Sequence, residues 1–330
     1  MSTLRKGSKI TIVLCLLALT TTAYAGDPNG AIRFLMAIGH IPAAPVSVLN
    51  EFVDLNSPEA IGNISAEARK ILRTMQSKQA FNLVIVGSQQ PDCNFTPDNV
   101  LPEPTNPVAP YRALRTLARI CAAQAWLLEK DGKKDEAFDL LLALVGMGSQ
   151  ISRHELLIGA MIGKAVSELG IDSLKVFLKR HPEPIFREKI AKYLSTLPRP
   201  LINIMGALEK ERGSFTWIQR VLAKPDFKME EVVSGMGGES DFSRRLAKLI
   251  GTPELEKMNQ EVLALYDSIL AIPATDPDLE KKLDEISKKA GLNTSETQTN
   301  IWFEITVSNF SHVGHQIASL EQKVNELLKQ

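Results

Sequence analysis

The sequence is poor in aromatic residues and carries no excess charge of either sign. Aromatic side chains make up 6% of the 330 residues, against a background rich in Leu, Ala, Ile and Val. This balance favours packed helices and speaks against an all-β fold. The 38 basic residues equal the 38 acidic ones, so we expect no nucleic-acid partner, because proteins that bind nucleic acid usually carry a basic surface.

The common catalytic motifs are also missing. The sequence contains no G-x-x-x-x-G-K-[ST] phosphate loop, no G-x-G-x-x-G dinucleotide motif, no G-x-S-x-G nucleophile elbow, no H-E-x-x-H zinc motif and no EF-hand loop. An enzyme with this sequence would need a nonstandard site, and no cofactor is indicated.

Long apolar runs are absent after the first 25 residues. Within those residues, basic side chains at positions 5, 6 and 9 precede an apolar run over 10–19, and Ala23-Tyr24-Ala25 has the small-x-small pattern of a cleavage site. We therefore expect a bacterial Sec-type signal peptide over 1–25, a mature chain that starts near Gly26, and a periplasmic or secreted location. Later apolar stretches are too short or too interrupted to cross a bilayer, so we expect no membrane span in the mature chain.

Cysteine is scarce as well. Of three cysteines, Cys15 lies within the predicted signal peptide, and Cys93 and Cys121 remain. Two thiols in an exported chain indicate one structural disulfide between Cys93 and Cys121. A redox-active pair is the alternative, although such pairs usually have C-x-x-C spacing.

Helical periodicity is abundant. Apolar residues recur at steps of three and four, and Pro or Gly interrupts the pattern about every 15 to 25 residues. The pattern predicts an all-α protein of stacked antiparallel helical hairpins, similar to an α-solenoid, with a long C-terminal helix. Among the expected helices are those over 66–86, 109–130, 135–149, 154–169, 172–180, 184–195, 201–222 and 296–328.

Two segments interrupt the helical pattern. Five prolines lie in the loop over 89–107, and Pro225 with three glycines marks the segment after residue 222. We therefore expect a helical-hairpin domain over 26–224, which includes the Pro-rich loop, followed by a C-terminal helical subdomain over 225–330.

Two stretches resemble known helical repeats. Residues 117–148, LARICAAQAWLLEKDGKKDEAFDLLLALVGMG, resemble a tetratricopeptide-type hairpin, with Gly132 in the turn and Ala137 at a helix contact. The P-x-C-x-aromatic start at 91–95, the Pro-rich loop, this hairpin and the following HELLIGAMIGKAVSELG resemble a group of exported bacterial helical-repeat proteins. That resemblance covers about residues 91–212; it implies a fold and an exported location and transfers no mechanism. Gly159 and Gly163, four residues apart, indicate tight helix packing within the chain.

Glu211 is the most unusual residue, because it interrupts an apolar helical stripe. The stripe consists of Leu201, Ile204, Leu208, Phe215, Ile218 and Leu222. A carboxylate in that position has to be paired, hydrogen-bonded or protonated with a raised pKa. Glu211 is a candidate acid or base that would line a binding groove with Glu209, Arg212 and Trp217. The alternative is a structural tie from Glu211 to an Arg or to backbone amides of a neighbouring helix.

The last predicted helix carries two further features. His312 and His315 are three residues apart, a spacing that permits two metal ligands. Both lie off the apolar stripe over 303–327, so exposed histidines without metal are the favoured interpretation. The stripe predicts packing along a neighbouring helix, and self-association in coiled-coil fashion is the alternative.

These observations favour a noncatalytic exported scaffold or interaction protein that binds a protein or peptide partner in the cell envelope. Two alternatives stay open: an enzyme or small-ligand binder with a groove around Glu211, and a coiled-coil subunit of an envelope complex.

Overall fold

A computed structural model describes residues 29–53, 55, 57–95, 110–153, 156–224, 241–273, 276, 278–289 and 310–329. These residues form helices and connecting turns, with one isolated bridge between Asn29 and Asp92 and no strand among them, so the all-α prediction is confirmed. The helices are α2 (Gly30–Gly39), α3 (Val46–Asn50), η1 (Ala60–Asn63), α4 (Ala66–Ser77), α5 (Ala80–Ser88), α6 (Tyr111–Lys130), α7 (Lys134–Ile151), α8 (Leu157–Arg180), α9 (Pro184–Thr196), α10 (Ile204–Leu222), α12 (Asp241–Leu249), α13 (Pro253–Leu270), α14 (Leu279–Lys289) and α16 (Phe310–Lys329). None of these helices combines the length and the apolar character that a membrane span requires.

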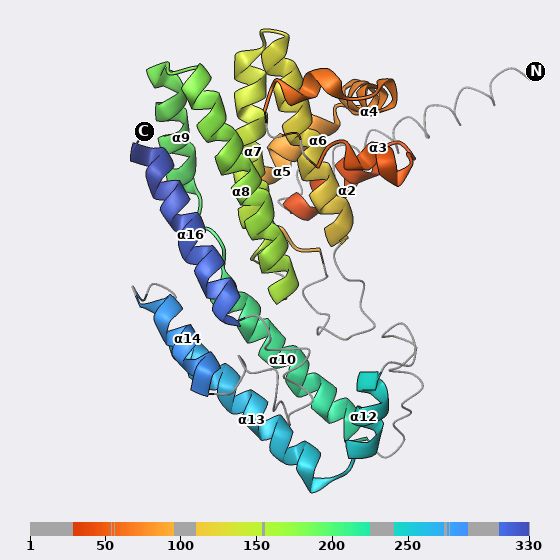
Figure 1. Ribbon diagram of the computed structural model, residues 1–330, viewed down its shortest axis with the longest axis vertical. Coiled ribbons are helices and arrows are strands. Elements are labelled where there is room, and N and C mark those ends of the chain that lie inside the picture. The colour runs from red at the N-terminus through yellow and green to blue at the C-terminus, as the bar shows by residue number, and fades with distance from the viewer. Residues whose placement is uncertain are drawn as a thin grey trace, which may run out of the picture.

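The core is built around α7. This helix contacts α5, α6, α8 and α9, and every residue from Leu140 to Ile151 is buried. Figure 1 shows α6, α7 and α8 side by side in the part of the molecule that also holds α2 to α5. A helix that is apolar on all faces has to be surrounded, and this explains why the Leu-rich stretch of the sequence became the centre of the bundle.

The turn between α6 and α7 forms at Gly132, as the tetratricopeptide-like pattern predicts. Gly132 has a φ of 79°, in the left-handed region that glycine adopts without strain. Its N–H donates to the Glu129 carbonyl, and the Lys133 N–H donates to the Leu128 carbonyl. These two bonds satisfy carbonyls at the end of α6 and direct the chain back along it.

Small residues bring α7 and α8 into close contact. A Cβ atom at Gly148 would collide with the carbonyl oxygen of Gly163, and one at Gly163 would collide with that of Gly148. The Ser167 hydroxyl donates a 3.1 Å hydrogen bond to the Val145 carbonyl across the same contact. The predicted tight packing at Gly163 is therefore confirmed, and its partner is a helix of the same chain.

Two predicted helix boundaries are wrong. The expected helix over 66–86 is interrupted between α4 and α5, where Gln79 has a φ of 55°. The expected break between 154–169 and 172–180 is absent, because Gly170 continues α8 and lies against Val145 of α7. Glycine serves here as a site of close helix approach, and its helix-breaking tendency is overcome by packing.

Among the later helices, α16 returns to the bundle, whereas α12 and α13 lie away from it (Figure 1). α16 contacts α8, α9 and α14, and α10 contacts α8 and α13. On α16, Leu320, Val324 and Leu327 are buried, while Lys323 forms ion pairs with Glu168 and Asp172 of α8. This part of the apolar stripe is thus covered within the chain; the predicted domain boundary near residue 225 and the side chains over 303–318 lie outside the described residues.

The predicted disulfide is not formed. Cys93 and Cys121 are both buried, and no disulfide joins them. The start of the Pro-rich loop is held instead by Asn29: its Oδ1 accepts the Asn94 N–H at 2.8 Å, its Nδ2 donates to the Asn94 carbonyl at 2.8 Å, and the Gly30 N–H donates to the Asp92 carbonyl at 2.6 Å. Hydrogen bonds to the start of α2 therefore hold the beginning of the Pro-rich loop. The rest of that loop, residues 96–109, lies outside the described part.

Candidate functional site

Glu211 lies where α10 meets the beginning of α8. Its Oε1 accepts the backbone N–H of Leu157, the first residue of α8, at 3.0 Å. The N-cap residue of α8 is Leu156, which has no side-chain acceptor, so Glu211 supplies the cap from another helix. Burial raises the pKa of the Glu211 carboxyl, and the Leu157 N–H offsets part of that rise. This is the backbone contact that the structural-tie alternative predicts.

Among the described contacts, none of the other residues expected to share a groove with Glu211 forms a hydrogen bond or ion pair with it. Glu209 is exposed, and Trp217 is half-buried. Arg212 forms a 2.7 Å ion pair with Asp267 on α13. Tyr266 of α13 is fully buried, and burial together with the neighbouring Glu211 carboxylate raises the pKa of its phenol. Glu211 therefore lies near the buried Tyr266 and the beginning of α8, and Arg212 pairs with α13.

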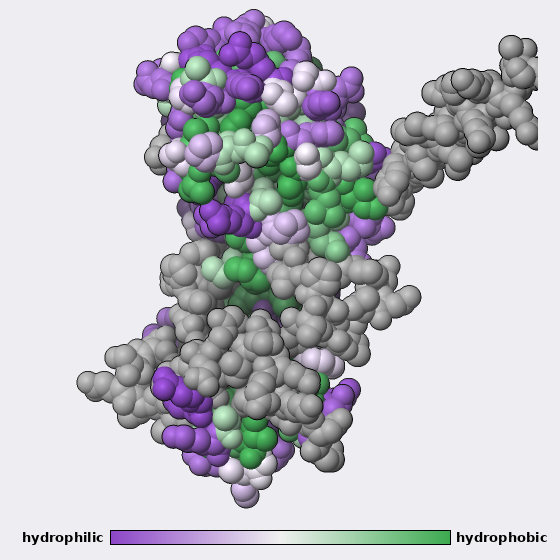
Figure 2. Space-filling view, turned by 90° about the vertical axis from the view of Figure 1, so that its right-hand side faces the viewer, coloured by the Kyte–Doolittle hydropathy of each residue, from purple (hydrophilic) through white to green (hydrophobic). Residues whose placement is uncertain are grey.

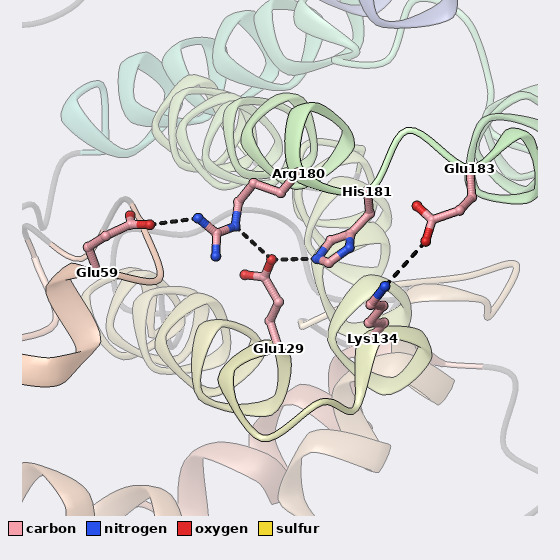
Figure 3. A network of polar contacts seen from close by, with 6 residues as sticks. All are labelled: Glu59, Glu129, Lys134, Arg180, His181 and Glu183. Atoms are coloured by element: carbon pink, nitrogen blue, oxygen red, sulfur yellow. Dashed lines mark hydrogen bonds and ion pairs between the residues drawn. The ribbon is translucent and has the colours of Figure 1, made fainter.

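A second polar cluster lies at the opposite end of α8 and joins the ends of several helices (Figure 3). Glu129, at the end of α6, has a side chain only 3% exposed, and its Oε1 accepts from Arg180 Nε at 2.9 Å and contacts His181 Nε2 at 2.6 Å. Arg180 also reaches Glu59 at 2.6 Å, and Lys134 pairs with Glu183 at 3.3 Å. The His181 ring packs against Phe177 with centroids 4.6 Å apart. These contacts tie together α6, α7, α8 and the chain segments at their ends, which is a structural role.

The described residues contain no group of three or more His, Cys, Asp or Glu side chains that would hold a metal ion. His312 and His315 belong to α16, but their side chains lie outside the described part, so the metal-ligand hypothesis stays a prediction.

The described residues form a groove between α3 and α6 that is a candidate binding surface. It has two adjoining lobes, of about 640 and 420 Å³, which share Leu49, Tyr111, Arg112 and Thr116. The remaining lining residues of the larger lobe are Ile38, Ile41, Pro110 and Ala113, and those of the smaller are Val46, Asn50, Arg115, Arg119 and Ile162. One lobe is therefore mainly apolar, and the other adds a row of arginines.

The apolar side of the groove continues onto the surface. Leu35 and Met36 of α2 and Val46 of α3 are exposed, as is Val53 just after α3. Figure 2 faces this side of the molecule and shows a patch of apolar side chains at the height of α2 and α3 in Figure 1. Exposed apolar side chains that gather next to a groove are typical of binding surfaces, whereas scattered ones are ordinary.

The cationic side of the groove is carried by α6. Arg112, Arg115 and Arg119 follow one another at steps of three and four, which places them along one face of the helix. Arg112 and Arg115 are exposed, and neither forms an ion pair with any described residue. Exposed cations elsewhere, such as Arg73 and Arg187, also form no ion pair with described residues, but neither of these two lines the groove. The groove therefore combines apolar walls with two guanidinium groups that no described carboxylate neutralises.

The arginines of this groove follow a simple local pattern that common motifs do not capture. In YRALRTLAR, at positions 111–119, they recur at helical spacing within a predicted helix. The same pattern does not reveal that α3, about 60 residues earlier in the chain, lies opposite this face of α6. Comparisons with protein-family models, with curated proteins and with solved structures find no match for the chain.

Proposed function

We propose that this protein is a noncatalytic interaction protein of the cell envelope, and that it holds a segment of a partner polypeptide in the groove between α3 and α6. The observation that carries the proposal is the groove itself, in which aliphatic side chains from α2, α3 and the connection between them share the lining with Arg112 and Arg115, two arginines with no ion-pair partner among the described residues. Such a surface gives hydrophobic contact area together with charge selectivity, the two components of a protein interface. The exported location rests on the predicted signal peptide and on the resemblance to exported helical-repeat proteins.

The tetratricopeptide-like stacking of hairpins belongs to the same proposal. α6, α7 and α8 follow one another as neighbouring helices joined by short connections, which supports it. α7 additionally contacts α5 and α9, so the arrangement also resembles a bundle around one central helix.

The alternative functions have less support. An enzyme or ligand site around Glu211 would use groups that are already engaged, because Glu211 caps α8 and Arg212 pairs with Asp267. A coiled-coil subunit would use the stripe on α16, but Leu320, Val324 and Leu327 are buried within this chain.

Site-specific photocrosslinking in cells that express the full chain tests the proposal. A benzoylphenylalanine at position 46, where Val46 is 55% exposed in the groove, should form an adduct with a partner polypeptide. The matched control is position 185 on α9, where Ile185 is 51% exposed and lies outside the groove.

The adduct at position 46 should disappear in a Thr116→Trp variant, because Thr116 lines both lobes and an indole there would fill them. The melting temperature of this variant should stay close to that of the parent protein. The same adducts at positions 46 and 185, or an adduct that persists in Thr116→Trp, would show that the groove is not the binding site.

A further inference from the structure

The chemistry of the groove also restricts the kind of segment that fits it. Arg112 and Arg115 are three residues apart, which corresponds to about 4.5 Å along α6 at about 1.5 Å per residue. Guanidinium groups bind carboxylates in a forked, two-bond geometry and prefer them to neutral acceptors. A ligand that runs beside α6 would therefore match this pair with carboxylates spaced by roughly one helical turn.

The opposite wall requires apolar contacts from the same ligand. Ile38, Ile41, Val46 and Leu49 come from α2, α3 and the connection between them, and Ile162 of α8 also lines the smaller lobe. An occupant must then present aliphatic side chains on one side and acidic side chains on the adjacent side, which is the pattern of an amphipathic segment.

The backbone of the groove favours a helical occupant over an extended one. Its walls are mainly helices together with the connection between α2 and α3, and none of the described lining residues belongs to a strand, so they offer no free strand edge to a peptide. An extended peptide in contact with these aliphatic walls would leave part of its own backbone without hydrogen-bond partners, and this is costly. A helix satisfies its backbone internally and presents only side chains.

We propose, as a refinement that rests on the proposed function, that the groove between α3 and α6 binds an amphipathic α-helix of a partner protein, with carboxylates at positions i and i+3 or i+4 that pair with Arg112 and Arg115. The aliphatic face of this helix contacts Ile38, Ile41, Val46 and Leu49. The recognition mode is that of a helix in a groove, with charge along one edge setting its direction and register.

Binding of three synthetic peptides to the mature protein tests this inference. The first is a capped 18-residue helix with a Leu and Ile seam and Glu at the stated positions. The second has Lys in place of these Glu residues, and the third has the acidic sequence with a central Pro, which breaks the helix. Fluorescence anisotropy should detect binding of the first peptide, with affinity that falls as salt is raised, and binding of the other two should be at least about tenfold weaker.

Charge reversal in the protein supplies the matched control. The Arg112→Glu/Arg115→Glu variant should bind the acidic helix at least about tenfold more weakly. The Arg73→Glu/Arg187→Glu variant has the same net charge, and its exposed arginines lie on α4 and α9 outside the groove, so it should bind like the parent. Both variants exchange exposed residues, and their melting temperatures should remain near that of the parent.

The following results of these binding experiments would overturn the inference. Equal binding of the Lys peptide would contradict the charge matching, and equal binding of the Pro peptide would contradict a helical occupant. Binding to phosphatidylglycerol vesicles that is lost in Arg112→Glu/Arg115→Glu, with no peptide bound, would show that the groove recognises an anionic lipid. If no peptide binds while position 46 still crosslinks a polypeptide through the groove, the acidic helix is wrong and the proposed function stands. If position 46 gives no specific adduct, the proposed function fails as well.

Discussion

Substitutions of Glu211 separate two contributions of this residue to stability: its hydrogen bond to the beginning of α8, and the ionisation of its carboxyl group in a mostly buried environment. Glu211→Ala removes the acceptor of the Leu157 N–H at the beginning of α8. Loss of a helix cap costs about 1 kcal/mol, within a range of about 0.5 to 2. Glu211→Gln keeps an acceptor oxygen in the same place and removes only the ionisation.

The pH dependence of these variants follows from the raised pKa of Glu211. A group whose pKa is higher in the folded state than its ordinary value of 4.5 stabilises the folded state at low pH, and this contribution is lost as the pH rises through the folded-state pKa. The free energy of unfolding of the parent should therefore fall, relative to Glu211→Gln, as the pH is raised from about 4.5 toward neutrality. At neutral pH Glu211→Gln should be as stable as the parent or more stable, whereas Glu211→Ala should be less stable than Glu211→Gln at every pH.

Urea denaturation of the mature protein at several pH values between about 4.5 and about 7.5 measures these differences. Glu209→Gln and Glu209→Ala are the controls, because Glu209 is an exposed carboxylate two residues away on the same helix. Parallel pH profiles of the parent and Glu211→Gln would refute the reasoning about burial. A Glu211→Ala variant as stable as Glu209→Ala would refute the cap.

Three further predictions concern the bundle and its ties. Gly148→Ala should destabilise the protein by about 1 to 3 kcal/mol, because a methyl group there collides with the backbone of α8. Gly213→Ala is the control, because a Cβ atom there would meet no atom within 4 Å. Its stability in denaturation experiments should be unchanged or rise by up to about 1 kcal/mol. When the mature protein is unfolded without reductant, Cys93 and Cys121 should both react with a thiol reagent. Reductant should leave the melting temperature of the folded protein unchanged. Absence of reactive thiols would show that a disulfide forms. Glu129→Ala should lower the free energy of unfolding by about 1 to 3 kcal/mol, because it removes a buried acceptor from Arg180 and His181. Glu59→Ala removes the exposed partner of Arg180 and should lower it much less. Equal effects of the two substitutions would contradict the central position of Glu129.

The sequence predicted local structure well where a local signal decides it. Low aromatic content and three-four periodicity predicted an all-α protein, and the bounds of α6, α7 and α9 fall within two residues of those expected. Gly132 was predictable as a turn, because few other residues adopt a left-handed conformation readily. Glu211 was identifiable as unusual, because a carboxylate within an apolar stripe has to find a partner.

Tertiary contacts decided what the local signals left open. Gly170 does not break α8, because the absence of a side chain allows α7 to approach. The helical segment breaks instead at Gln79, between α4 and α5, although glutamine is not a residue that signals a helix end in the sequence. Cys93 forms no disulfide with Cys121, and hydrogen bonds from Asn29 hold the segment that follows α5. Counting cysteines cannot reveal such a contact, since it depends on residues 65 positions apart.

For the groove, too, the sequence predicts the character of each helix face, and the tertiary structure decides how those faces are arranged. The arginines of α6 can be read from the sequence as one helical face, and the aliphatic residues of α2 and α3 can be read as apolar. Only the folded structure places these two sets opposite each other, because their approach is set by how α2 and α6 pack together. Periodicity reports which face of a helix is apolar or charged, and the packing of distant segments decides which of those faces remain open to a partner.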